Sequence, residues 1–110
     1  MSRLFYCSYL GTEVELSKAR EQHIVEKHPE TLPNYLEQLA KTLRNPEEIR
    51  RSDQDSDALL FFKWFDNIRS GRYLVVVVVN QEEPLRRWIV TAYTDRKLSK
   101  RGEKVWPKNT

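Results

Sequence analysis

The chain has 110 residues, of which 39% are hydrophobic and 32% are charged. This length suits one domain with one core, and this composition excludes a disordered segment. The longest apolar run, Tyr73–Val79, is far shorter than the roughly 18–20 residues that a membrane-spanning helix needs. The first three residues also lack the apolar segment of a signal peptide. We therefore expect a single soluble domain, 1–110, located in the cytoplasm.

Cysteine and histidine are too few for a zinc site. Cys7 is the only cysteine, which excludes an internal disulfide and a cysteine-based metal site. It lies in an apolar, aromatic stretch, so we expect a buried and unreactive thiol. His23 and His28 are the only histidines, and they do not have the i, i+4 spacing of a zinc-binding pair on a helix. The sequence predicts no metal and no cofactor.

Charge is distributed unevenly along the chain. Residues 1–83 carry 11 basic against 14 acidic side chains, whereas residues 84–110 carry 8 against 2. A basic C-terminal tail from about residue 95 is typical of a surface that faces phosphates, and a solubilising tail is the alternative. The candidate nucleic-acid-binding residues of this tail are Arg96, Lys97, Lys100 and Arg101.

Two helices are predicted in the first half of the chain. A short apolar strand, Leu4–Leu10, and an alternating extended piece, Glu13–Leu16, come before them. Ser17 is a suitable N-cap for a helix over 17–27, and a following proline ends that helix. The second helix is predicted over 33–44, where a proline occupies the first turn and apolar residues recur at helical spacing.

The second half of the chain has the pattern of extended strands. Glu48–Ser52 is a candidate short strand, and Ala58–Phe65, Tyr73–Val79 and Trp88–Thr94 are longer ones joined by hairpin-length connections. The unbroken valine run predicts that Tyr73–Val79 is the middle strand, covered on both faces. Helices followed by a strand meander predict an α+β fold, with the helices packed on one face of an antiparallel sheet.

Four residues on these elements could carry chemistry. His23 lies on the first helix, where a histidine facing the core is the alternative. Lys63 interrupts an aromatic strand, which is costly unless its ammonium meets water, a carboxylate or a phosphate; a lysine that protects an edge strand from aggregation is the alternative. Thr91 and Tyr93 are two residues apart on one strand and therefore share a face.

Five segments follow one another in an informative order. They are HIVEKHPE at His23–Glu30, NPEEI at Asn45–Ile49, LLFFKWF at Leu59–Phe65, YLVVVVV at Tyr73–Val79 and IVTAY at Ile89–Tyr93. Over residues 17–106 this series resembles the small phage- and toxin-associated nuclease domains grouped with barnase, EndoU, the tRNase colicins and RelE. The resemblance implies two N-terminal helices packed on a four-stranded antiparallel sheet, with the active site on the open face of the sheet.

The resemblance also implies a metal-independent ribonuclease. In this chemistry a ribose 2′-OH attacks the adjacent phosphorus, a histidine transfers a proton and a fixed cation offsets the developing charge. The catalytic residues that it carries over are His23, Lys63, Thr91 and Tyr93, with His28 and Arg72 as supporting candidates. We expect the four catalytic side chains to converge on one solvent-reachable patch.

Two other interpretations stay open. The first is a catalytically inactive module on the same fold that binds RNA or a protein, in which His23 would be buried away from Lys63 and Thr91. The second is a nucleic-acid-binding protein driven by its basic tail, whose affinity would fall steeply with salt. As a toxin-like nuclease, the protein would have RNA as its substrate and a cognate inhibitor protein as a partner.

Overall fold

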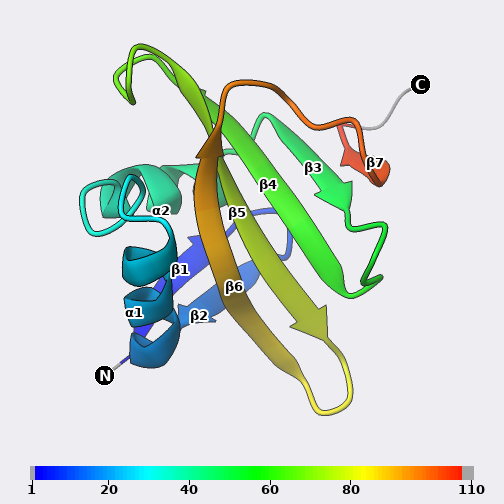
Figure 1. Cartoon of the computed structure of the whole chain (residues 1–110). Helices are drawn as coiled ribbons and strands as arrows, with labels where there is room; N and C mark the ends of the chain where they lie inside the picture. Colours follow the sequence, from blue (N-terminus) through cyan, green and yellow to red (C-terminus); the bar gives the residue numbers. More distant parts are fainter. Residues whose placement is uncertain (1, 108–110) are drawn as a thin grey trace.

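The structure is a computed structural model that describes residues 2–107. Within this range the chain forms two helices and one sheet of seven strands (Figure 1). In chain order the elements are β1 (Arg3–Cys7), β2 (Thr12–Leu16), α1 (Lys18–Lys27), α2 (Leu36–Arg44), β3 (Glu48–Arg51), β4 (Ala58–Phe65), β5 (Arg72–Gln81), β6 (Arg86–Asp95) and β7 (Glu103–Trp106). The strand order is β1-β2-β6-β5-β4-β3-β7. Neither helix of this range has the length and apolar character that crossing a membrane requires.

The expected sheet of four antiparallel strands is wrong, because strands are added at both of its edges. The β1–β2 hairpin joins one edge, where β2 runs parallel to β6 through the pair Glu15 and Trp88. At the other edge β7 pairs antiparallel with β3. The sheet is therefore mixed and has seven strands over residues 2–107. The added strands satisfy backbone N–H and C=O groups that the edges of a four-stranded sheet would leave unpaired.

The helices form close to their predicted positions. The Oγ of Ser17 accepts a hydrogen bond from the backbone N–H of Arg20 at 3.1 Å, which caps the start of α1. α1 ends at Lys27, just before the His–Pro pair, as predicted. α2 begins at Leu36 rather than at residue 33, because residues 31–35 form turns.

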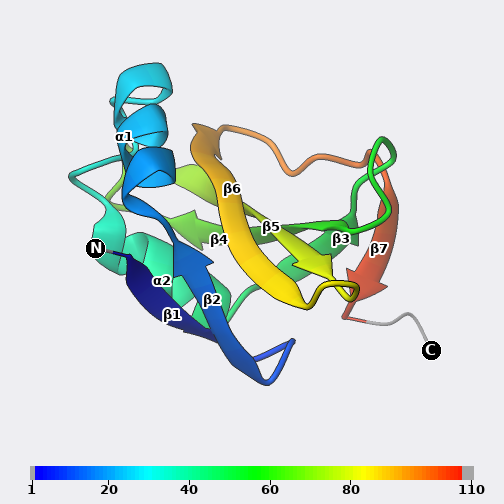
Figure 2. The ribbon, with the colours of Figure 1, turned by 90° about the horizontal axis from the view of Figure 1, so that it is seen from below.

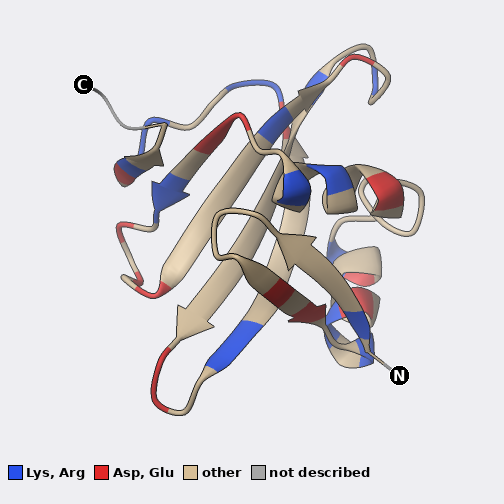
Figure 3. Cartoon of the chain, turned by 180° about the vertical axis from the view of Figure 1, so that it is seen from behind, with Lys and Arg blue, Asp and Glu red and all other residues tan. Residues whose placement is uncertain are grey.

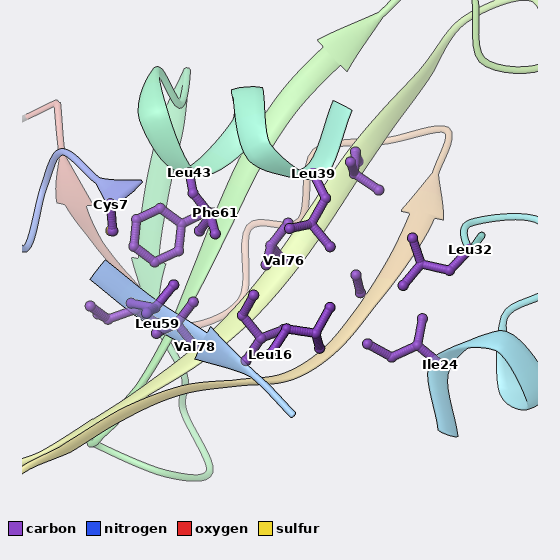
Figure 4. Close-up of a cluster of buried hydrophobic side chains, with 14 of the residues drawn as sticks. Cys7, Leu16, Ile24, Leu32, Leu39, Leu43, Leu59, Phe61, Val76 and Val78 are labelled. Atoms are coloured by element: carbon purple, nitrogen blue, oxygen red, sulfur yellow. The ribbon is translucent and has the colours of Figure 1, made fainter. Parts of the chain in front are cut away.

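The apolar core lies between the sheet, α2 and the β1–β2 hairpin. Leu39 and Leu43 of α2 approach Phe61 of β4 and Val76 of β5, and all four side chains are fully buried (Figure 4). Cys7 belongs to the same cluster and is fully buried, as expected. Burial raises the pKa of its thiol, which keeps the sulfur in its unreactive neutral form. We call this side of the sheet the covered face.

β5 is the middle strand, as the valine run predicted. Leu74 and Val76 belong to the core cluster of the covered face, so Val75 and Val77 point to the opposite side, which we call the open face. Val75 is nevertheless fully buried, between Phe62 of β4 and Tyr93 of β6 on the neighbouring strands. Side chains therefore cover part of β5 on both faces, which explains the lack of alternation in its sequence.

The open face is bounded on two sides. Figure 2 shows α1 rising on one side of it, and the 96–102 segment rising with the β3–β4 loop on the other. Arg50 of β3 holds this segment by donating to the carbonyl oxygens of Lys100 at 3.2 Å and Gly102 at 3.1 Å. Arg101 forms an ion pair with Asp53 of the β3–β4 loop at 3.2 Å. The basic segment after β6 is therefore attached to the sheet rather than extended away from it.

Candidate active site on the open face

A β-bulge in β6 decides which of its side chains reach the open face. The pairing of β6 with β5 shifts between Val77 and Val78, which leaves Val90 as an extra residue. On a regular strand Trp88 and Thr91 would point to opposite faces, because they are three residues apart. The extra residue brings both onto the open face. The side chains that β6 presents there are Arg86, Trp88, Thr91 and Tyr93.

α1 adds two functional side chains to this strip. Arg20 and Ile24 are four residues apart on the side of α1 that packs on β6, with Ile24 buried in the core, and His28, the C-cap residue, follows four residues later. The guanidinium carbon of Arg20 lies 5.5 Å from the centre of the Trp88 ring, and its Nη1 donates to the carbonyl oxygen of Val90 at 3.5 Å. Arg20 is therefore fixed at the bulge.

His28 lies at the other end of the strip. The centre of its ring is 5.8 Å from that of Tyr93, with the ring planes inclined at 38°. The Nδ1 of His28 is 3.6 Å from a carboxylate oxygen of Glu30. This carboxylate can orient the imidazole. We call the set Arg20, His28, Trp88, Thr91 and Tyr93 the β6 site.

The surroundings of Tyr93 keep its phenol neutral. Burial raises the pKa of Tyr93, and the negative charge of Asp95, two residues later, raises it further. A neutral phenol retains its O–H donor. Tyr93 is therefore suited to donate a hydrogen bond to an anionic oxygen.

His23 lies on α1 but outside the β6 site. Its side chain is exposed, so the alternative of a histidine facing the core is wrong. At about 100° per residue His23 is roughly 60° around the helix from Arg20. The opposite quadrant of α1 carries Glu21 and Val25, which line a pocket beside β1. His23 thus stands on the solvent side of the helix next to Arg20.

Lys63 does not join the other predicted residues. It pairs directly with Leu74, a residue of the covered face, whereas Thr91 pairs with Val77 of the open face. The ammonium of Lys63 donates to the carbonyl oxygen of Asn45, at the end of α2, at 3.0 Å. The expectation that all four predicted side chains converge is therefore wrong, because strand alternation directs Lys63 to the opposite face from Thr91 and Tyr93.

The supporting and nucleic-acid-binding candidates separate into two groups. Arg72 stands at the start of β5 and lines a pocket together with Arg96 and Lys97. Arg101 is instead paired with Asp53, and the backbone carbonyl of Lys100 is a partner of Arg50. The predicted basic tail is thus divided between a pocket at the end of the sheet and an attachment to β3.

Sequence reasoning missed Arg20 and Trp88. A signal for Arg20 was present, because it stands four residues before Ile24 and eight before His28 on one side of a helix. No comparable signal existed for Trp88, whose direction depends on the bulge. Arg86 also contacts this indole, with its guanidinium carbon 4.5 Å from the ring centre. The end of the site away from His28 is therefore basic and aromatic.

Charged positions of β2 also lie beside β6. Figure 3 shows the acidic positions of β2, which are Glu13 and Glu15. Val14 and Leu16 alternate with them and belong to the core, and Glu15 pairs with Trp88, so the two glutamates lie on the outer side of β2. The cations that contact Trp88, Arg20 and Arg86, are therefore the groups of this region that favour a polyanion.

The fold and the site together define a class of protein: a small domain whose described residues form two helices and a mixed seven-stranded sheet, with polar side chains gathered on the uncovered face of that sheet. The sequence model of a family described as phage-Barnase-EndoU-ColicinE5/D-RelE like nuclease 2 matches residues 5–106. The chain belongs to this family, which confirms the resemblance found in its sequence. Neither a curated protein nor a solved structure matches the chain.

Proposed function

We propose that this nuclease cleaves RNA at the β6 site, without a metal ion, by attack of a ribose 2′-OH on the adjacent phosphorus. The observation that carries the proposal is the contact of His28 with Tyr93 on the open face, at 5.8 Å between ring centres. Thr91 lies two residues from Tyr93 on the same face of the strand. A proton-transfer group, a neutral phenol and a hydroxyl are thus held at one place.

The reaction needs two proton transfers. The 2′-oxygen forms a bond to phosphorus and gives its proton to a base, while the bond from phosphorus to the 5′-oxygen breaks and that oxygen takes a proton from an acid. The products are a 2′,3′-cyclic phosphate and a 5′-OH. Histidine is the side chain that gains and loses protons most readily near neutral pH. In the proposal His28 is one of these two proton-transfer groups, the base or the acid. His23, which is exposed next to Arg20, is the other.

In this proposal Arg20, and not Lys63, is the cation that offsets the charge developing on the phosphate. A guanidinium can bind two oxygens of a phosphate at once and offset the charge that develops on them. Arg20 is held against Trp88 and the carbonyl of Val90, so it is positioned before a substrate arrives. Tyr93 and Thr91 donate hydrogen bonds to the same phosphate.

The donor set supports a reaction without a metal ion. The β6 site contains a guanidinium, an imidazole, two hydroxyls and an indole. Mg²⁺, the usual metal of nucleases, prefers carboxylate and other oxygen ligands together with water. Charge compensation in the proposed reaction therefore comes from Arg20.

Cleavage of single-stranded RNA in excess EDTA tests the proposal. We expect cleavage to continue, with products that end in a cyclic or 3′-phosphate, and RNA with methylated 2′-oxygens to remain intact. His28→Ala should lower kcat/KM by about 10²–10⁴, the usual contribution of a positioned proton-transfer group. Arg20→Ala should lower it by about 10²–10³, as for the loss of one charge-stabilising donor.

Lys41→Ala changes an exposed cation of α2, on the far side of the sheet, and should cleave as the wild type does. Loss of cleavage in EDTA and its recovery with Mg²⁺ would contradict the mechanism. An intact His28→Ala protein that cleaves at the wild-type rate would show that this histidine is structural. Tight RNA binding by a wild-type protein that never cleaves would favour the inactive binding module.

A further inference from the structure

A basic pocket lies at the end of the sheet where β5 begins and β6 ends. Its volume is about 410 Å³, and it is separate from the contacts that form the β6 site. Four cationic side chains, one hydroxyl and one carboxylate line it: Arg69, Arg72, Arg96, Lys97, Thr94 and Asp95. We call it the Arg69 pocket. Arg69 belongs to the β4–β5 loop and was not among the residues that the sequence singled out.

We propose that the Arg69 pocket binds a backbone phosphate of the RNA substrate, at a nucleotide next to the one that is cleaved. This inference rests on the proposed function and extends it, because it makes the preferred substrate an oligonucleotide that spans two sites. Arginine and lysine side chains are the usual ligands of phosphate groups in nucleic-acid complexes.

The positive charge of the pocket is not neutralised by ion pairs. Over residues 2–107, none of its four cations forms a salt bridge with a carboxylate, whereas Arg50 and Arg101 in the neighbouring segments do. Asp95 contributes the single negative charge of the lining. Its Oδ1 accepts a hydrogen bond from the backbone N–H of Lys97 at 3.2 Å, so it shapes the turn that carries Lys97. The pocket keeps an excess of positive charge.

The loop that presents Arg69 has a backbone that most residues avoid. Arg69, Ser70 and Gly71 have successive φ angles of 48°, 66° and 111°. Gly71 is required, because a Cβ there would lie 2.5 Å from the indole of Trp64. Non-glycine residues in this region of backbone angles are uncommon, and they concentrate at functional sites, where the surroundings hold them in place.

Arg72 holds the loop in this conformation. Its Nη1 donates to the carbonyl oxygens of Arg69 at 3.0 Å and Gly71 at 2.7 Å. Ile68, just before this turn, is fully buried and anchors the loop to the core. Contacts within the chain therefore hold the loop in shape, which lowers the entropic cost of binding.

The Arg69 pocket adjoins the β6 site. Asp95 lines this pocket and also a neighbouring one of about 280 Å³, which Tyr93 lines together with Leu60 of β4. Tyr93 and Asp95 are two residues apart on β6, or about 6.6 Å along the strand. A short RNA bound at Tyr93 can therefore place a second phosphate among the four cations.

Binding to an RNA that cannot react tests this inference. The probe is a short single-stranded oligouridine with a methyl group on every 2′-oxygen, followed by fluorescence anisotropy over a series of salt concentrations. The variant Arg69→Asn/Arg96→Ala/Lys97→Ala should bind it at least about tenfold more weakly, the usual effect of losing a charged hydrogen bond. The plot of the logarithm of the binding constant against the logarithm of the salt concentration has a negative slope. In the triple variant this slope should become shallower by about 0.7, the value for one phosphate contact.

Two controls separate the pocket from general charge and from loop conformation. Lys41→Ala/Arg44→Ala removes two exposed cations of α2, and the wild-type salt slope should remain. Ser70→Asn alters the same left-handed turn without changing its charge, and asparagine tolerates positive φ. This control should bind as the wild type does. Arg72 is left intact because it holds the loop.

The binding measurements test the Arg69 pocket independently of whether the protein cleaves RNA. Wild-type affinity and an unchanged salt slope in the triple variant would overturn it, whether or not the protein cleaves RNA. A pocket that binds inorganic phosphate, seen as amide shifts at residues 96 and 97, while the triple variant still binds RNA normally, would also overturn it. If the protein cleaves, the triple variant should show a raised KM and an unchanged kcat, since the β6 site is intact.

Discussion

Tyr93 shows how burial and one neighbouring charge prepare a side chain for its role. Burial raises its pKa, and Asp95 raises it further. The phenol therefore stays neutral to a higher pH than a tyrosine in water and keeps the proton that it donates. In the proposed reaction Tyr93 binds a phosphoryl oxygen, whereas His28, at 5.8 Å, moves the proton.

The raised pKa of Tyr93 makes a prediction about stability at alkaline pH. As pH rises, the unfolded chain loses the phenolic proton before the folded protein does. The stabilisation from neutral Tyr93 is therefore complete below the ordinary pKa of about 10, and it is lost as pH rises through the higher pKa of the folded state. We expect the free energy of unfolding to fall more steeply above pH ~10 in the wild type than in Tyr93→Phe. Urea unfolding over a series of pH values measures both slopes, and equal slopes would show that Tyr93 is not responsible.

Lys63 shows how one element stabilises another. A lysine in the middle of an aromatic strand is costly unless its ammonium finds a partner. Its partner is the carbonyl oxygen of Asn45 at the C-terminal end of α2, 3.0 Å away. The last carbonyl groups of a helix lack partners within the helix and carry partial negative charge. Lys63 therefore caps α2 from β4.

Lys63→Met should lower stability without affecting cleavage. The substitution keeps most of the aliphatic stem and removes the ammonium that binds Asn45, so we expect the free energy of unfolding to fall by about 1 kcal/mol. kcat/KM for RNA should stay within about twofold of wild type, because the side chain points to the covered face. Denaturant unfolding and cleavage kinetics on the same preparation check both parts. A folded Lys63→Met protein that cleaves a hundredfold more slowly would restore the catalytic assignment.

At the scale of the whole molecule, one core connects most elements. The cluster contains Leu16 of β2, Ile24 of α1, Leu39 of α2, Phe61 of β4 and Val76 of β5. Loss of packing at any of these positions therefore affects several strands and both helices. That the chain unfolds as a single cooperative unit stays a prediction from its length.

Leu39→Ala should therefore destabilise the whole domain at once. Leu39 is fully buried, and truncation of a buried leucine usually costs about 2–5 kcal/mol. The three tryptophans stand on β4, β6 and β7, so their fluorescence reports on separate parts of the sheet. We expect the fluorescence and far-ultraviolet circular dichroism transitions to coincide in both proteins, with a lower midpoint in the variant. Two separate transitions in the wild type would contradict a single domain.

The sequence by itself determined the features that depend on neighbouring residues. Ser17 and the following proline set the limits of α1, because capping and proline act over a few residues. The valine run placed β5 in the middle of the sheet, because an unbroken apolar strand needs cover on both faces. The order of motifs indicated the nuclease family that residues 5–106 match.

Only the tertiary structure decided which side chains meet. The bulge at Val90 changes the direction of Trp88 relative to Thr91, and strand alternation separates Lys63 from both. Residues 103–106 belong to the predicted basic tail. In the structure they pair with β3 and form the edge strand β7. The physical reason is that the face on which a strand residue lies depends on register. Register is set by hydrogen bonds between segments distant in sequence, and a shift of one residue exchanges the two faces.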